Sequence, residues 1–176
     1  FSHKVLEKGN QNNPTALNIL GLSRLRNASS VEDFKGAKSL FQQAFDASIT
    51  EVAAGLNLGY LKLRLGETQG ALTTFTLLEK RCSICQDMLV GKAIALNRLG
   101  RYTEAKPILE TVLDKNPKQL QALYQLALYF QNFEGNHLKT NEILVQLNSL
   151  LPPNQKEMQE KVRVWLSQHE SQPSVL

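Results

Sequence analysis

Residues 99–105 read Leu-Gly-Arg-Tyr-Thr-Glu-Ala, and the alanine that closes this stretch belongs to a series that recurs along the chain. Ala37, Ala71 and Ala105 are spaced 34 residues apart, and a bulky apolar residue follows each of them by four positions. An internal repeat determines the architecture of a chain before local preferences do. The rest of the sequence is therefore best interpreted against this interval.

A second series of small residues has the same interval and consists of Gly59, Ala93 and Ala127, while Gly66 and Gly100 lie between the two series. This arrangement predicts a unit of helix, turn and helix. A small residue on one helix lets its partner approach closely, and the bulky residue of the other series fills the adjacent space. We expect a large residue at Gly59 to be costly. With only 10 Gly and 6 Pro, the composition also favours an all-α fold.

The unit is similar to the tetratricopeptide repeat (TPR), which has Leu-Gly or Leu-Ala in its first helix, Ala-x-x-x-Phe in its second and Pro near its end. The clearest copy spans residues 86–119 and contains the opening stretch, Leu109 and Pro117. The resemblance implies an all-α fold in which antiparallel helix pairs stack into a right-handed superhelix, an α-solenoid.

The spacing divides the chain into four copies, at residues 14–51, 52–85, 86–119 and 120–153. The turn of the first copy is about four residues longer than the others, and Ser30 with Asp33 indicates a helix start after it. The fourth copy contains one extra residue near Glu134 and Gly135. We expect both additions to be absorbed without loss of the helix-turn-helix unit.

The two ends of the chain differ from the copies. Residues 154–170 predict a capping helix whose apolar stripe covers the open end of the fourth copy. The stripe consists of Met158, Val162, Trp165 and Leu166. Residues 171–176 are expected to be a frayed tail. Residues 1–13 are interpreted as the remainder of the second helix of a preceding repeat, so we expect the chain to be a fragment of a longer protein.

The resemblance also implies a ligand groove, because the concave surface of a TPR array is lined mainly by the first helix of each copy. The groove positions of the family fall on apolar residues, amides and a few arginines. They are Asn18, Leu22 and Arg26 in the first copy; Leu56, Asn57, Tyr60 and Arg64 in the second; Val90, Ile94, Asn97 and Arg98 in the third; and Tyr124, Gln125, Leu128 and Gln131 in the fourth.

Such a groove suits an extended peptide or an amphipathic helix of a protein partner. The alternative is that several apolar members pack only against neighbouring helices. The favoured ligand contacts are Tyr60, Tyr124, Arg64 and Arg98, because the polar ends of these side chains favour a solvent-exposed surface.

One TPR subset binds the carboxyl-terminal carboxylate of a chaperone with two Lys, one Arg and two Asn. Here Asn57 matches one of the five, but Leu22, Asp87 and Gly91 occupy positions that should supply Asn, Lys and Arg. We therefore do not expect cytosolic chaperone tails to bind.

Cys82 and Cys85 are the most distinctive chemical feature of the sequence. They lie at the junction between the second and the third copy. A redox-active pair is disfavoured without a strand-helix-strand context. A zinc site is disfavoured because it needs two more ligands, and the only histidines, His3, His137 and His169, are widely spaced. We therefore expect no metal. A disulfide, which needs an oxidising compartment, and a pair of packed thiols stay equally open.

The net charge of +4 does not indicate nucleic acid, because the basic residues are scattered and have no interleaved stacking aromatics. No apolar run is long enough to span a membrane. The sequence also contains no phosphate loop, nucleophile elbow or paired catalytic histidine, so we predict neither enzymatic activity nor a cofactor.

These features predict a non-enzymatic scaffold for a protein partner. In overall style the chain resembles small bacterial repeat lipoproteins such as the tight-adherence (Flp) pilus assembly protein, which implies a periplasmic or outer-membrane-anchored location. The alternatives are a cytosolic chaperone or adaptor and the regulatory repeat region of a larger enzyme. The oligomeric state is not predicted.

Overall fold

The computed structural model describes residues 13–82 and 85–170. The expected tail and all but one residue of the expected helix remainder at 1–13 lie outside the described residues. Within these ranges the chain is all-helical, without a β-strand, as predicted. The first helices of the copies are α1 (Pro14–Arg26), α3 (Val52–Arg64), α5 (Gln86–Arg98) and α7 (Leu120–Tyr129). The second helices are α2 (Val31–Ala47), α4 (Thr68–Glu79), α6 (Tyr102–Lys115) and α8 (His137–Leu150).

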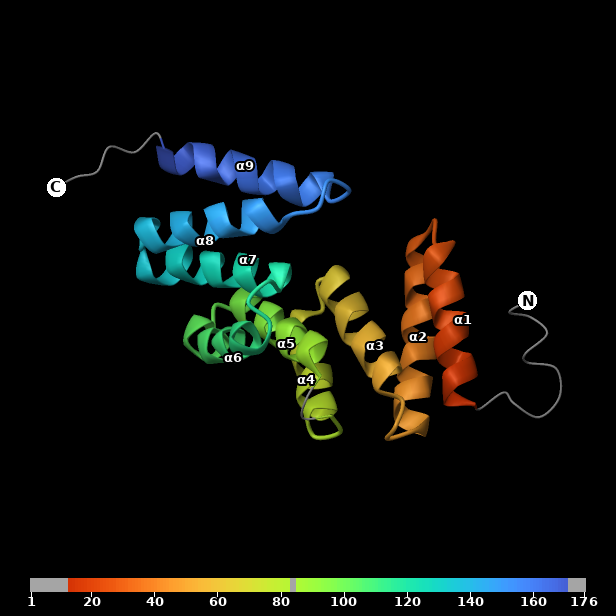
Figure 1. Ribbon diagram of the computed structural model, residues 1–176. Helices are drawn as coiled ribbons and strands as arrows, with labels where there is room; N and C mark the ends of the chain where they lie inside the picture. The colour runs from red at the N-terminus through yellow and green to blue at the C-terminus, as the bar shows by residue number, and fades with distance from the viewer. Residues whose placement is uncertain (1–12, 83–84, 171–176) are drawn as a thin grey trace. The chain divides into compact units, whose positions relative to one another are not determined.

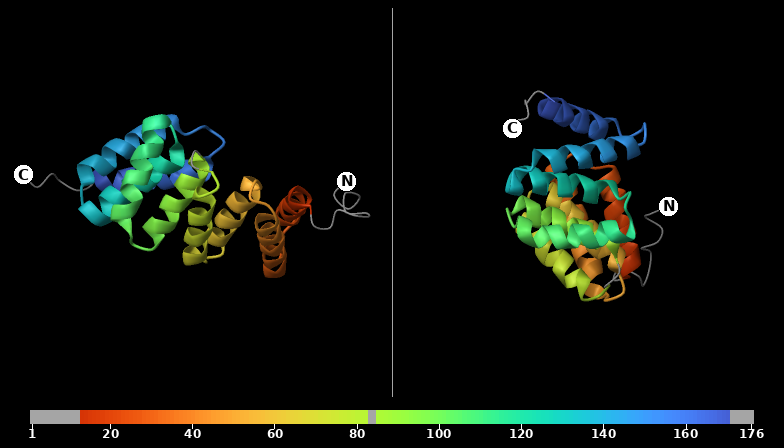
Figure 2. Two further views of the ribbon diagram at one scale, coloured as in Figure 1. Left: turned by 90° about the horizontal axis from the view of Figure 1, so that it is seen from below. Right: turned by 60° about the vertical axis from the view of Figure 1, so that its left-hand side comes forward.

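The chain divides into two compact units, residues 1–95 and 96–176, which we call unit 1 and unit 2. In unit 1, α2 packs against both α1 and α3, and α3 packs against α4 (Figures 1 and 2). In unit 2, α6, α7, α8 and the last helix α9 (Lys156–Glu170) pack in sequence order (Figure 1). Within each unit these helices therefore lie against their neighbours in the sequence, as in a repeat array.

The first helix pair shows how the sequence starts and stops its helices. Pro14 occupies the first turn of α1, and the Asn13 side chain accepts a hydrogen bond from the Ala16 N–H at 3.0 Å. Residues 27–30 form the lengthened turn. Ser30 then begins α2 with a capping box, because its hydroxyl accepts from the Asp33 N–H while the Asp33 carboxylate accepts from the Ser30 N–H.

Glycine ends α3 and α5, because the chain there needs a backbone conformation that other residues adopt at a cost. Gly66 has φ of 78° and Gly100 has φ of 74°. In both turns the residue after the glycine donates its N–H to a carbonyl in the last helical turn, from Glu67 to Lys62 and from Arg101 to Leu96, each at 2.9 Å.

The small residues are needed where aromatic rings cross the first helices. A Cβ atom added at Gly59 would lie 2.5 Å from two carbon atoms of the Phe75 ring, and one at Gly21 would lie 2.5 Å from Phe41. Both rings are completely buried. The small-to-large pairing expected from the spacing is thus the contact that joins the two helices of a pair.

The extra residue of the fourth copy is absorbed by a π-helical segment, η2 (Phe130–Glu134). A π turn accommodates one more residue than an α turn, so α7 continues into η2 without a loop. Gly135, with φ of 62°, ends η2. The Tyr129 hydroxyl donates to the Glu134 carboxylate at 2.8 Å across this segment.

Helix α9 covers unit 2 with the predicted stripe. Val162 is fully buried among residues of α7 and α8, and Met158, Trp165 and Leu166 pack against the same cluster. The other buried members are Leu123, Ala127, Leu144, Leu147 and Leu151. None of the described helices is both long and apolar enough to span a membrane.

Candidate functional site

An open groove of about 770 Å³ lies between α7 and α9 in unit 2. Helix α7 and the η2 segment contribute residues at helical spacing, so one face of α7 forms one wall. Helix α9 forms the opposite wall. The lining residues are Tyr124, Leu128, Gln131 and Asn132 on one side, and Glu157, Glu160, Lys161, Val164, Trp165 and Gln168 on the other.

The apolar part of the lining consists of Tyr124, Leu128, Val164 and Trp165. The rings of Tyr124 and Trp165 meet edge to face with centroids 5.8 Å apart, which joins the two walls. Val164 is 46% exposed although it lies on a helix that is otherwise polar outside its buried stripe. Because no described side chain covers it, this valine offers apolar surface to a ligand.

Charged and amide groups surround the apolar part. Lys161 donates to the Glu157 carboxylate at 2.6 Å, and this hydrogen bond lowers the pKa of Glu157 and raises the pKa of Lys161. A second hollow of about 520 Å³ shares these two residues and continues toward Gln121 and Gln155. The rim can therefore satisfy polar groups of a ligand along its length.

Three of the four groove residues predicted in the fourth copy, Tyr124, Leu128 and Gln131, line this groove. The fourth, Gln125, is buried. The Asn97 side chain, which is also buried, donates at 3.0 Å to both the backbone and the side-chain oxygen of Gln125. The expectation of a ligand-facing side chain is therefore wrong for Asn97 and Gln125, because both side chains are buried in unit 2 and the Asn97 amide donates to Gln125 there.

In unit 1 the predicted residues divide between surface and interior. Asn18 is buried, and it accepts from the Asn57 amide at 2.8 Å and donates to the Glu51 carboxylate at 3.4 Å. Val90 and Ile94 are buried as well, so they are corrected to core residues, as is Asn18. Leu56 and Asn57 are half-buried, and the exposed members are Leu22, Arg26, Tyr60 and Arg64. Arg98, at the start of unit 2, is also exposed.

Tyr60 combines surface and packing roles. Its hydroxyl donates to the backbone oxygen of Asp87 at 2.7 Å, and its ring meets Phe75 edge to face with centroids 5.4 Å apart. Burial of the hydroxyl, together with the nearby Asp87 carboxylate, raises the pKa of Tyr60 to about 12. The residue remains 37% exposed, so part of the ring is available to a ligand.

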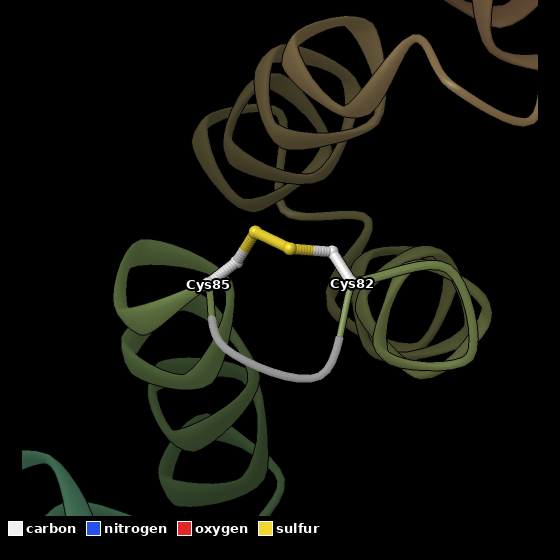
Figure 3. Close-up of a disulfide and its surroundings, with 2 residues drawn as sticks. All are labelled: Cys82 and Cys85. Atoms are coloured by element: carbon white, nitrogen blue, oxygen red, sulfur yellow. A yellow bond between two sulfur atoms is a disulfide. The ribbon is translucent and has the colours of Figure 1, made fainter.

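Cys82 and Cys85 are joined by a disulfide in the structure, with Cα atoms 5.8 Å apart (Figure 3). The bridge links the end of α4 to the start of α5, where the Cys85 carbonyl accepts the Leu89 N–H at 3.2 Å. Next to it, Arg81 donates to the Phe45 carbonyl at 2.8 Å and lies over the Phe45 ring. Nothing in the described ranges groups His, Cys, Asp and Glu side chains so that they could hold a metal.

The α9 wall was missed by sequence reasoning, which assigned that helix a covering role only. Five of its groove residues, Glu157, Glu160, Lys161, Val164 and Gln168, lie outside the predicted stripe. The available signal was Val164, an apolar residue two positions after Val162 and therefore on another face of the helix.

The model of the coatomer epsilon subunit family matches residues 4–162. The chain belongs to the coatomer epsilon subunit family. No curated protein matches the sequence.

Solved structures share the fold, and among them are proteins described as TPR proteins. A TPR protein from Parabacteroides merdae ATCC 43184 is 22% identical with a TM-score of 0.75, and the match covers 93% of this chain and 61% of that protein. MamA from Desulfovibrio magneticus RS-1 is 18% identical with a TM-score of 0.69, and 94% of this chain and 100% of the MamA chain are covered. YrrB, described as a TPR protein with an unusual peptide-binding site, is 20% identical with a TM-score of 0.69, covering 91% and 79%. The fold is therefore TPR-like.

Proposed function

We propose that this chain is a non-enzymatic scaffold that holds a peptide or helix of a protein partner in the groove between α7 and α9, within a larger assembly. The observation that carries the proposal is the exposed Val164 beside Trp165, Tyr124 and Leu128 in an open groove of about 770 Å³. An apolar surface rimmed by polar groups is typical of a binding site for another protein segment.

The polar rim suits a peptide more than a small apolar molecule. Gln131, Asn132 and Gln168 each offer both a donor and an acceptor, which is what a peptide backbone requires. The paired charges of Glu157 and Lys161 leave little net charge to select a highly charged ligand. Affinity is therefore expected to come from apolar side chains of the partner, with the amides fixing their register.

The comparisons support the class of this proposal. The family is named for a subunit of the coatomer, so its members are parts of a multiprotein assembly. YrrB, which shares the fold, has a peptide-binding site. By this reasoning the partner of the present chain is a protein, and the chain acts by holding it.

The disulfide favours an extracytoplasmic version of the proposal, because such bonds persist in oxidising compartments. One extracytoplasmic function would be assembly of a bacterial surface structure such as a pilus. Only the sequence resemblance supports that function. Alkylation of thiols in freshly lysed source cells tests the location. Bridged Cys82 and Cys85 are expected, and free thiols would instead favour a cytosolic adaptor.

A matched pair of valine variants tests the groove. Val164→Asp places a charge in the apolar wall, whereas Val145→Asp makes the same change at a 55% exposed position on α8, outside the groove. Partner capture from the source organism is expected to fall at least tenfold for Val164→Asp, which corresponds to about 1.4 kcal/mol. Val145→Asp should capture as the unmodified chain does.

Circular dichroism and melting temperature should be nearly unchanged in both variants, since both valines face solvent. Equal capture by the two variants would place the partner elsewhere on the molecule and contradict the proposal.

A further inference from the structure

The bridge between Cys82 and Cys85 is a reactive group that the proposed scaffold function does not use. Both cysteines are partly exposed, so the junction between α4 and α5 is open to a thiol of another molecule (Figure 3). The sequence contains only these two cysteines. Exchange at this bridge therefore requires an attacking thiol from outside the chain.

Cys85 lies at the start of a helix, where negative charge is stabilised. It comes immediately before Gln86, the first residue of α5, and its carbonyl accepts the Leu89 N–H at 3.2 Å. The unpaired N–H groups of the first helical turn form the positive end of the helix dipole. The carboxylate of Asp87 in this turn is exposed to solvent, which weakens its repulsion of a second negative charge. A thiolate at Cys85 is therefore favoured.

Cys82 lies at the end of a helix, where negative charge is disfavoured. Its backbone N–H donates to the Leu78 carbonyl in the last turn of α4 at 2.9 Å. The carbonyl groups of that turn form the negative end of the helix dipole. Of the two neighbouring cations, Lys80 is exposed to solvent and Arg81 donates to the Phe45 carbonyl at 2.8 Å. The two sulfur atoms therefore differ in their ability to carry a negative charge.

Contacts other than the bridge hold both sides of the junction in place. On the α4 side, Arg81 lies over the Phe45 ring, 3.8 Å from its centroid, and donates to the Ser48 carbonyl at 3.4 Å. On the α5 side, the Tyr60 hydroxyl donates to the Asp87 carbonyl at 2.7 Å. Because these contacts do not depend on the sulfur–sulfur bond, the cysteines stay close together after reduction. Their high effective concentration lets the bridge form again.

We propose that the bridge is a thiol–disulfide exchange site that accepts two electrons from an external dithiol, with Cys82 as the sulfur attacked and Cys85 as the leaving group. A thiol leaves faster when its thiolate is stabilised, which assigns that role to Cys85. The sequence context disfavours a redox catalyst, and exchange requires only that the bridge open and close. Both cysteines lie in unit 1, so the proposal is independent of the groove between α7 and α9.

The exchange takes place in two steps. A thiolate of the dithiol attacks the Cys82 sulfur, so a mixed disulfide forms, the bond between the two cysteines breaks and its electron pair leaves with Cys85 as a thiolate. The second thiol of the dithiol loses its proton and attacks its own sulfur partner in the mixed disulfide, which releases Cys82 as a thiolate. Both cysteine thiolates take up protons. The dithiol is oxidised to a disulfide, and the bridge is reduced to two thiols.

Two single-cysteine variants test the difference between the sulfur atoms. Cys82→Ser leaves only the thiol of Cys85, and Cys85→Ser leaves only the thiol of Cys82. Each variant loses the same bridge, so their melting temperatures should agree within a few degrees. At pH 6 iodoacetamide is expected to react about fivefold faster with the Cys85 thiol, because a larger thiolate fraction outweighs its lower intrinsic nucleophilicity.

The same two variants in concentrated guanidinium chloride provide the control. Unfolding removes the helix ends, so the two thiols should then react at equal rates. A rate difference that persists in the unfolded variants would show that neighbouring residues in the sequence cause it, and would contradict the assignment.

The unmodified chain tests the order of the steps. It is exposed briefly to glutathione, quenched with excess N-ethylmaleimide and mapped by mass spectrometry. Glutathione is expected on Cys82 and maleimide on Cys85. Excess dithiothreitol should reduce the folded chain, and its removal in air should restore the bridge.

Three results would overturn the proposal. Equal alkylation rates in the folded variants, or a faster reaction of the Cys82 thiol, would remove the basis for the leaving group. Glutathione found mainly on Cys85 would reverse the roles of the two sulfur atoms. A bridge that stays oxidised in the folded chain under excess dithiothreitol would be a structural bond that is closed to exchange.

Discussion

At the scale of single residues, the fold depends on glycines that lie against aromatic rings. Gly59 and Gly91 both face Phe75 in unit 1, and neither has room for a Cβ atom. The ring is completely buried and cannot move without opening a cavity. These glycines are therefore fixed by a close approach between helices rather than by backbone conformation.

Gly59→Ala is expected to lower the free energy of unfolding by about 1–2 kcal/mol. Overpacking against Phe75 lowers the free energy of unfolding by about 1–3 kcal/mol. The better helix propensity of alanine raises it by about 0.5–1 kcal/mol. Denaturant unfolding followed by circular dichroism measures the difference.

Gly70→Ala is the control for this prediction, because a Cβ atom there would meet only the Lys62 side chain, at 3.6 Å. That variant should gain about 0.4–1 kcal/mol, since alanine restricts the unfolded chain. If both variants were equally stable, the close contact at Gly59 would not be a constraint.

Tyr60 makes the stability of the folded chain depend on pH in the alkaline range. The pKa of Tyr60 in the folded chain is about 12, above the ordinary value of 10.0. The unfolded chain therefore releases the tyrosine proton first, and stability falls as pH rises from about 10 toward 12. Tyr60→Phe should lose about 0.5–1.5 kcal/mol at neutral pH.

Denaturant unfolding across this alkaline range measures the effect, and Tyr60→Phe should show a shallower decline than the unmodified chain. Parallel declines would mean that the hydroxyl is as well solvated in the folded chain as in the unfolded one.

At the scale of elements, the disulfide and the π-helical segment each accommodate a departure from the repeat pattern at a junction between helices. The bridge joins α4 to α5 where the second copy has Ser83 in place of the usual terminal proline. The η2 segment takes up the extra residue of the fourth copy inside a continuous helix, so that α8 still packs on α7. The copies differ most at their junctions, because the sequence of a junction is less restrained by helix packing than the sequence of a helix.

Removing the disulfide is expected to lower the free energy of unfolding by about 2 kcal/mol, the value that loop closure gives for so short a ring. The double variant Cys82→Ser with Cys85→Ser and the reduced unmodified chain should unfold at the same denaturant concentration. Adding reductant to the double variant provides the control and should change nothing. An unchanged midpoint on reduction of the unmodified chain would show that the bridge does not stabilise unit 1.

At the scale of the whole molecule, each unit contains helices that pack on their neighbours in sequence, α1 to α4 in unit 1 and α6 to α9 in unit 2. Stability in such arrays is local, because it is the sum of the helix pairs and their nearest contacts. Helix α9 closes one end by burying Val162, and the same helix presents Val164 to the groove. One helix therefore stabilises unit 2 with one face and lines the proposed binding groove with the adjacent face.

Val162→Asp should destabilise unit 2 by about 3 kcal/mol or more, because an unpaired charge would be buried in its core. Hydrogen exchange is the suitable measurement. Amides of α7 and α8 should lose protection, whereas those of α1, α2 and α3 should keep it. Val164→Asp, with the same chemistry two residues away, should leave both units protected. Uniform loss of protection along the chain would show that the two units unfold together.

The all-α fold could be predicted from the sequence alone, as could the repeat interval, the helix starts and the lengthened turn at residues 27–30. The four first helices begin at Pro14, Val52, Gln86 and Leu120, which are the first residues of the four predicted copies. These features depend on local signals and on spacing, and both can be counted along a chain. Val162 was correctly assigned to the core because it lies in a regular stripe.

The spacing of residues did not reveal which side chains of the first helices face solvent, because their exposure depends on how the helices pack. Asn97 and Gln125 occupy predicted groove positions, but both are buried, and the Asn97 amide donates to Gln125 in the interior. Conversely, Val164 lies outside the groove positions of the repeat and yet lines the groove. The physical reason is that an amide is buried or exposed according to whether a partner lies within hydrogen-bonding distance, and that distance depends on residues far apart in the sequence.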